Sequence, residues 1–153
     1  MTLPNVFTKE VSDEMIGRIE NLRPDTQRLW GKMDVGQMLA HLCVSYEMVY
    51  EPEKHKKPNA LMGLVLKLYV KKIVTNEKPY GKNSPTASAF KMTTEKVFDT
   101  EKARLIEYIE KTRNLGENEF DGKESMSFGK MNKTEWNNML YKHLDHHLNQ
   151  FGV

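Results

Sequence analysis

Apolar residues recur at helical spacing in five segments of this 153-residue chain, and no segment shows sustained alternation of apolar and polar residues. This pattern predicts an all-α fold with little or no sheet. The length fits a single domain over residues 1–153 with a substantial core. The five predicted helices span about Lys9–Leu22, Val35–Tyr50, Ala60–Val74, Thr94–Arg113 and Asn132–Gln150.

Two of the predicted helices begin with a capping box, in which two side chains satisfy each other's free backbone N–H groups. Asp34 and Gln37 form this pattern ahead of the second helix, and Asn132 and Glu135 form it ahead of the last. The second helix is apolar on much of its circumference, which is typical of a helix at the centre of a fold.

Two long loops are expected between the predicted helices. The first, Thr75–Met92, is rich in Asn, Lys, Pro, Gly and Ser, and the second covers Glu117–Met131. Loops of this length are uncommon in compact domains and are often functional. A simple connection across the surface remains the alternative for both.

Charge and hydropathy limit the partners that we expect. The net charge of +2 is too small to indicate nucleic-acid binding, and the short basic clusters at Lys54–Lys57 and Lys71–Lys72 fit solvated helix ends. The longest apolar stretch, Ala60–Val70, has about half the ~20 residues of a membrane-spanning helix, so no membrane partner is expected. With Cys43 alone and no secretory signal, we expect a reduced, cytoplasmic protein.

The last predicted helix carries a pair of histidines that can share a ligand. His143 and His147 are four residues apart, so both side chains lie on one face, one turn apart. That face also carries Leu140 and Leu144, whereas His146 lies at its edge. Buried imidazoles without partners are energetically costly, so both rings need a partner, and one shared metal ion would satisfy both. Two hydrogen-bonded side chains are the alternative.

His41 is the best third ligand, because it lies in the most apolar helix and bundles build metal sites from facing helices. The alternative is a hydrogen-bonded core histidine. Three imidazoles accept zinc, nickel, copper or iron and leave an open coordination position, which is typical of catalytic metal sites. The catalytic residues remain unknown. Candidates for a supporting role around the metal, each of which also fits a solvated helix residue, are Gln37, Glu47, Asp145, His146 and Gln150.

The histidine pattern resembles that of the DinB/YfiT-like superfamily, in which a His from one helix joins two His, four apart, on a later helix. The resemblance is carried by His41, by His143 and His147, and by Gln150 three residues after the last His. Trp30-Gly31 ahead of His41 and Phe128-Gly129-Lys130 ahead of Trp136 resemble a branch of the superfamily without assigned activity. The chain departs from the common pattern at Leu148-Asn149 and at Met126-Ser127, where Arg-Gly and His-Pro are expected.

The resemblance implies a DinB-like four-helix bundle, here with one additional helix and two long loops. It also implies a homodimer and a His-ligated metal, with zinc or nickel favoured. Some members use a low-molecular-weight thiol as cofactor. The first functional hypothesis is therefore a divalent-metal-dependent enzyme for a small-molecule substrate, either a thiol-dependent S-transferase acting on small electrophiles or a hydrolase. The alternatives are a non-catalytic metal-binding stress-response module and an interaction protein with a metal-free histidine cluster.

Overall fold

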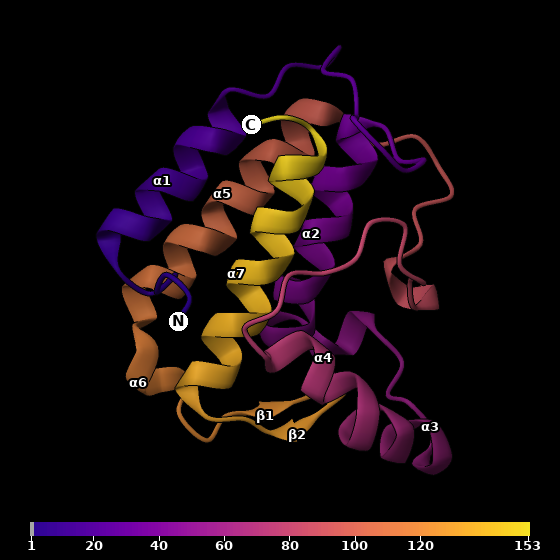
Figure 1. Ribbon diagram of the computed structural model, residues 1–153, viewed down its shortest axis with the longest axis vertical. Helices are drawn as coiled ribbons and strands as arrows, with labels where there is room; N and C mark the ends of the chain where they lie inside the picture. Colours follow the sequence, from indigo (N-terminus) through magenta and orange to yellow (C-terminus); the bar gives the residue numbers. More distant parts are fainter. Residues whose placement is uncertain (1) are drawn as a thin grey trace.

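The chain is mostly helical in the computed structural model, which describes residues 2–153 (Figure 1). Its four longest helices pack together: α2 contacts α5 and α7, and α1 contacts the same two helices. The prediction of a helical protein is thus confirmed. The bounds of these helices are α1 (Lys9–Glu20), α2 (Val35–Tyr50), α5 (Phe98–Leu115) and α7 (Lys133–Gln150).

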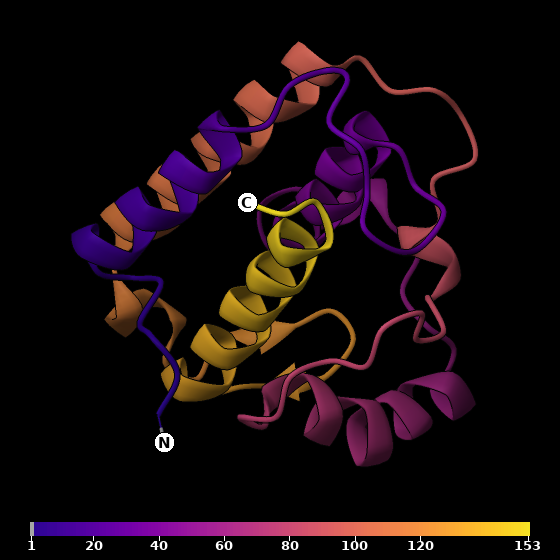
Figure 2. The ribbon, with the colours of Figure 1, turned by 45° about the horizontal axis from the view of Figure 1, so that its top comes forward.

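The remaining elements are short and lie around these four helices. A single helical arm over residues 60–75 consists of α3, a π-helical turn η2 and α4, and α4 packs against α7. The arm lies at the edge of the molecule in both views (Figures 1 and 2). The bounds are η1 (Pro52–Lys54), α3 (Ala60–Val65), η2 (Leu66–Val70), α4 (Lys71–Thr75), η3 (Ser88–Phe90), α6 (Glu117–Phe120), β1 (Glu124–Ser125) and β2 (Gly129–Lys130).

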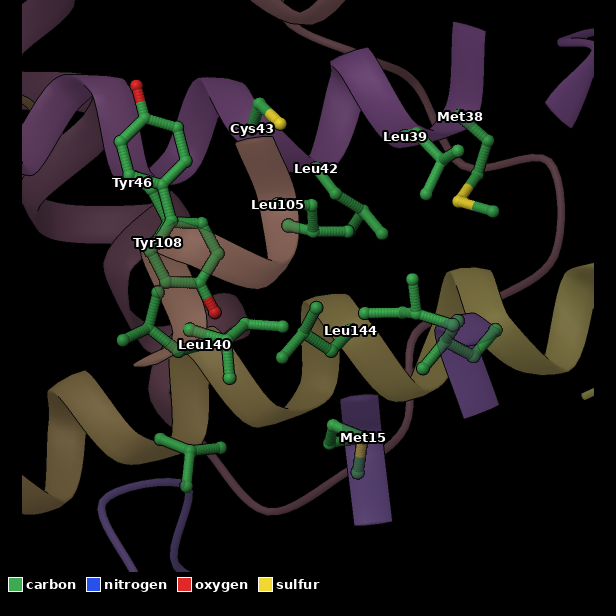
Figure 3. Close-up of a cluster of buried hydrophobic side chains, with 14 of the residues drawn as sticks. Met15, Met38, Leu39, Leu42, Cys43, Tyr46, Leu105, Tyr108, Leu140 and Leu144 are labelled. Carbon is green, nitrogen blue, oxygen red and sulfur yellow. The ribbon is translucent and has the colours of Figure 1, made fainter. Parts of the chain in front are cut away.

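The core is formed where the inner faces of the long helices meet (Figure 3). Leu42 of α2, Leu105 of α5 and Leu144 of α7 are almost completely buried there. Burying each such side chain contributes about 1.5–3 kcal/mol to folding. Tyr46 and Tyr108 stack with their rings nearly parallel and their centroids 5.7 Å apart, which joins α2 to α5. The core therefore fixes α2 relative to α7, the two helices that carry the histidines.

Both predicted capping boxes are present. Asp34 accepts a hydrogen bond of 2.7 Å from the backbone N–H of Gln37, and Asn132 accepts one of 2.9 Å from Glu135. These caps satisfy N–H groups that a helix start leaves free. As a result, α2 has the predicted bounds and α7 begins one residue after the predicted start.

The fourth predicted helix corresponds to α5, and its predicted start at Thr94 is wrong, because α5 begins at Phe98. The backbone just before it lies close to α2 instead: a Cβ atom at Gly36 would lie 2.6 Å from the carbonyl oxygen of Lys96. Val97 is an extended N-cap residue and is exposed, although its spacing suggested a buried helical position. A packing contact between distant segments thus overrides the local helical pattern.

The second predicted loop also contains regular structure that the sequence pattern did not indicate. After α6, the strands β1 and β2 pair antiparallel, with Glu124 opposite Lys130 and Ser125 opposite Gly129. Gly129 has a φ of 69°, a left-handed conformation that glycine adopts without strain. Strands of two residues are too short to show alternation in the sequence, so the loop prediction is corrected here.

Candidate metal centre

The structure brings His41 of α2 together with His143 and His147 of α7. One ring nitrogen from each residue lies within 4.8 Å of one nitrogen from each of the others. Ring centroids are 4.8 Å apart for His41 and His143, 4.5 Å for His41 and His147, and 5.0 Å for the pair on α7. His41 and His147 are buried and His143 is half-buried.

Gln150 fixes the orientation of His147. Its amide nitrogen donates a 2.7 Å hydrogen bond to the carbonyl oxygen of Trp30, so its Oε1 accepts from His147 Nδ1, also at 2.7 Å. Because Nδ1 carries the hydrogen, Nε2 of the neutral ring keeps a free lone pair. Gly31 permits this arrangement: its φ is 86°, and a Cβ atom there would lie 2.3 Å from the Gln150 amide nitrogen.

The segment between α4 and α5 fixes the orientation of His41. Its Nδ1 lies 2.8 Å from the carbonyl oxygen of Phe90, in η3. A carbonyl only accepts, so Nδ1 of His41 donates and Nε2 keeps its lone pair. The Phe90 ring also packs edge-on against His41 and His143, with centroids 5.3 and 5.7 Å away. The first predicted loop therefore lies directly against the histidines.

His143 has two hydrogen-bonding arrangements, because its Nδ1 lies 2.8 Å from the rotatable hydroxyl of Ser45. If Nδ1 donates to Ser45, Nε2 is free, and all three Nε2 lone pairs are available to one ion. If Ser45 donates instead, Nε2 of His143 carries the hydrogen and donates to Nε2 of His41, 2.8 Å away. The first arrangement suits a metal, and the second is a self-contained hydrogen-bonded chain without one.

The donor set fits a divalent transition metal. Three neutral imidazoles with their Nδ1 atoms hydrogen-bonded to protein groups are the usual form of histidine ligands. Ligand nitrogens around tetrahedral zinc are about 3.3 Å apart, from Zn–N distances of about 2.0–2.1 Å. The Nε2 atoms of His41 and His143 are somewhat closer than this. Small rotations of the rings would bring the cluster to that spacing, so the three histidines could hold a metal ion.

Burial keeps the cluster neutral. Burial and, to a smaller extent, the neighbouring His41 together lower the pKa of His147 to about 3, although the hydrogen bond to Gln150 opposes them. Burial also lowers the pKa of His41, and the Phe90 carbonyl opposes that effect. The pKa of His143 lies well below its ordinary value because of burial and of the other two rings. At neutral pH all three rings are therefore in the unprotonated form that metals require.

The other residues proposed to support the site have different contacts. Gln37 closes the cap of α2 and donates to the carbonyl oxygen of Thr94. Asp145 accepts a 2.9 Å hydrogen bond from Arg18 of α1. Glu47 binds His55 and Arg104. These three residues hold helices and loops together, whereas Gln150 forms a hydrogen bond with a histidine of the cluster.

His146 lies between the cluster and a neighbouring pocket. Its ring packs edge-on against His147 on one side, and against Trp30 and Tyr80 on the other. The pocket has a volume of about 250 Å³ and includes these two aromatic side chains and Lys82, whose ammonium group lies over the Trp30 ring. His146 thus belongs to the wall of this pocket and supports His147 by packing.

Two residues around the cluster were missing from the sequence-based set. Ser45 follows His41 by four residues on the same helix, so its proximity to the same partners could have been found from helical spacing. Phe90 does not belong to a recognisable sequence motif, and it is 49 positions from His41 in the chain. Only the path of the segment between α4 and α5 brings it to the site.

Comparison with known proteins gives a family but no activity. Neither a curated protein nor a solved structure matches the chain. A family model matches residues 5–152, which is nearly the whole chain and includes all three histidines. The chain therefore belongs to the family described as "Protein of unknown function (DUF1569)".

Proposed function

We propose that this protein is a divalent-metal-dependent enzyme whose metal, zinc or nickel, is held by Nε2 of His41, His143 and His147. The observation that carries the proposal is the orientation of the rings. Two of the three Nδ1 atoms donate to groups that only accept, and the third lies against a hydroxyl that can accept. The three Nε2 lone pairs can thus be available to one ion.

The chemistry that such a centre supplies follows from its ligands. An ion held by three neutral imidazoles keeps its positive charge and an open coordination position, so it acidifies a thiol or a water molecule. The chain's own residues would position the site: Gln150 and Ser45 orient the rings, and Phe90 shields His41 and His143 from water.

Thiol-dependent transfer to small electrophiles is the reaction class that we favour. It is supported by the resemblance of the histidine pattern to the DinB/YfiT-like superfamily, together with the packing of α1, α2, α5 and α7, which we interpret as a DinB-like four-helix bundle. A homodimer is part of the same proposal. The pocket beside His146, with aromatic walls and Lys82, offers space for a small molecule near the cluster.

The test is a two-step measurement on the purified chain. Zinc and nickel are first titrated calorimetrically into the metal-free protein, where we expect saturation at one ion per chain. The loaded protein is then assayed with low-molecular-weight thiols and a set of alkylating and epoxide electrophiles. Metal-dependent thiol consumption supports the transferase. Metal-dependent ester or amide hydrolysis without any thiol would replace it with a hydrolase.

Two further outcomes would reject an enzyme. Stoichiometric metal binding without turnover of any electrophile or ester would assign the site to a non-catalytic metal-binding module, such as one in a stress response. Failure to bind either metal would leave the hydrogen-bonded chain from Ser45 through His143 and His41 to Phe90 as the native state of the cluster.

A further inference from the structure

The helical arm over residues 60–75 exposes an unusual amount of apolar surface. Ten large apolar side chains are exposed in residues 2–153, and seven of them lie in this one arm. Leu61 is 75% exposed and Tyr69 is 67% exposed. Contiguous apolar surface of this kind marks an interaction site in soluble proteins. The outer face of the arm is defined by Leu61, Met62, Leu64, Val65, Leu68, Tyr69 and Ile73.

The opposite side of the arm is attached to the body of the protein. Lys71 donates to the carbonyl oxygen of Lys130 and pairs with Glu135 at 2.9 Å. The side chain of Lys67 lies against Gly129: a Cβ atom added at Gly129 would be 3.2 Å from Cε of Lys67. These contacts hold the arm against β2 and α7, and they leave the outer face turned away from the core. The arm lies at the periphery in both ribbon views (Figures 1 and 2).

The arm and the segment leading into it are strongly basic. Residues 54–76 contain six lysines and neither aspartate nor glutamate, in a chain whose net charge is only +2. Lys56 and Lys57, just before the arm, and Lys72, which precedes Ile73 in the chain, are exposed. The outer face therefore combines apolar side chains with positive charge, so an apolar partner with negative charge complements it.

We propose that the outer face binds the surface of an anionic lipid bilayer, with the arm lying in the plane of the headgroups. Helices that bind in this way carry large apolar residues on one side and lysines beside them. The apolar side chains would enter the boundary of the acyl chains, and the lysines would extend to lipid phosphates. None of the described helices is long and apolar enough to cross a bilayer, so the contact would be peripheral.

The charges favour a lipid surface over a second copy of the chain. In a two-fold symmetric contact the same face meets itself, so Lys72 would be buried against apolar side chains of the copy. The arm offers no carboxylate to pair with it. An unpaired buried charge is costly, whereas at a bilayer the same lysine stays in the headgroup layer. This proposal revises our sequence-based expectation of no membrane partner, and it is independent of the histidine cluster.

Cosedimentation with vesicles tests the proposal on the full chain. We expect binding to vesicles of phosphatidylglycerol and phosphatidylcholine to be at least about tenfold tighter than binding to phosphatidylcholine alone. The variant combining Leu61→Gln, Leu64→Gln and Leu68→Gln should lose this binding. Since all three side chains are exposed, the variant should fold normally, which circular dichroism verifies. The matched control replaces the three exposed apolar residues outside the arm by glutamine: Leu29, Val97 and Leu115.

The outcomes are distinct. Binding that the arm variant loses and the control variant keeps supports the proposal. Equal binding by wild type and arm variant, or no binding to anionic vesicles, would overturn it. Sedimentation velocity measures whether the chain forms a dimer. If the protein does not bind vesicles and forms a dimer that the arm substitutions dissociate, the outer face is a self-association surface instead.

Discussion

The Nε2 atoms of His41 and His143 lie 2.8 Å apart, although the two residues are separated by 102 positions in the chain. Two neutral imidazoles at this distance share a hydrogen between them. Two ligands of one tetrahedral zinc ion would lie about 3.3 Å apart, a spacing that small rotations of the rings would give. Packing of α2 on α7 through Leu42 and Leu144 holds the two rings in this position.

Gln150 should matter through its two buried hydrogen bonds. Replacing it in Gln150→Leu leaves His147 Nδ1 and the Trp30 carbonyl without partners. We expect a loss of about 1–3 kcal/mol in the free energy of unfolding and roughly 10–100-fold weaker metal binding. Urea denaturation and metal titration measure the two effects. Asn149→Leu, at the exposed neighbouring position, is the control, and equal losses in both variants would contradict a specific role for Gln150.

Gly31 should be needed for the hydrogen bonds of Gln150, because it leaves the space that the Gln150 amide occupies. In Gly31→Ala the new Cβ would meet the Gln150 amide nitrogen, and the φ of 86° disfavours a side chain. We therefore expect a metal affinity reduced in the same direction as in Gln150→Leu. The double variant should be little worse than either single one, because both substitutions break one contact. Fully additive losses would show that the two residues act independently.

Ser45→Ala should separate the two hydrogen-bonding arrangements of His143. It removes the hydroxyl from Nδ1 of His143 without changing the three ligands. A metal site loses an orienting group, so we expect roughly tenfold weaker binding of zinc or nickel with the fold intact. Calorimetric titration provides the measurement. An unchanged affinity would mean that the hydroxyl does not orient the ring.

The metal-free protein should lose stability as the pH falls below about 6.5, the ordinary pKa of histidine. Burial lowers the folded-state pKa of the three rings, to about 3 for His147. At a pH between the folded and unfolded pKa values, the unfolded chain binds more protons than the folded chain. The contribution of each neutral ring to the free energy of unfolding is therefore fully present above the unfolded pKa and declines below it. The decline is at most about 1.4 kcal/mol per pH unit for each ring. Urea denaturation from pH 7.5 downwards should therefore show a shallower decline in His147→Gln than in wild type. Parallel declines would exclude this contribution.

The sequence predicts helices best where local signals coincide. The capping box of Asp34 and Gln37 and the apolar pattern behind it give the bounds of α2, and the four-residue spacing of His143 and His147 places both on one face. The start of α5 was misplaced because the contact between Gly36 and Lys96 is tertiary. The exposure of the helical arm is likewise invisible in the sequence, since its apolar pattern is the same as that of a packed helix.

The residues around the histidines also differ in whether their contacts are local in sequence or come from distant segments. Gln150 follows His147 by three residues, so its contact is local and predictable. Phe90 reaches His41 only through the path of a long segment, for which no local pattern exists. Asp145 lies on the same helix as two of the histidines but its carboxylate binds Arg18, because α1 packs on that side.

Metal content of the purified protein tests the central claim most directly. Elemental analysis should find one zinc or nickel ion per chain in wild type after dialysis, and none in His147→Ala. The control His146→Ala should keep its ion, because it removes a ring that packs against His147 but none of the three ligand nitrogens. Circular dichroism verifies that both variants fold. Undiminished metal in folded His147→Ala, or no metal in wild type even after exposure to both ions, would contradict the assignment of these three histidines as a metal centre.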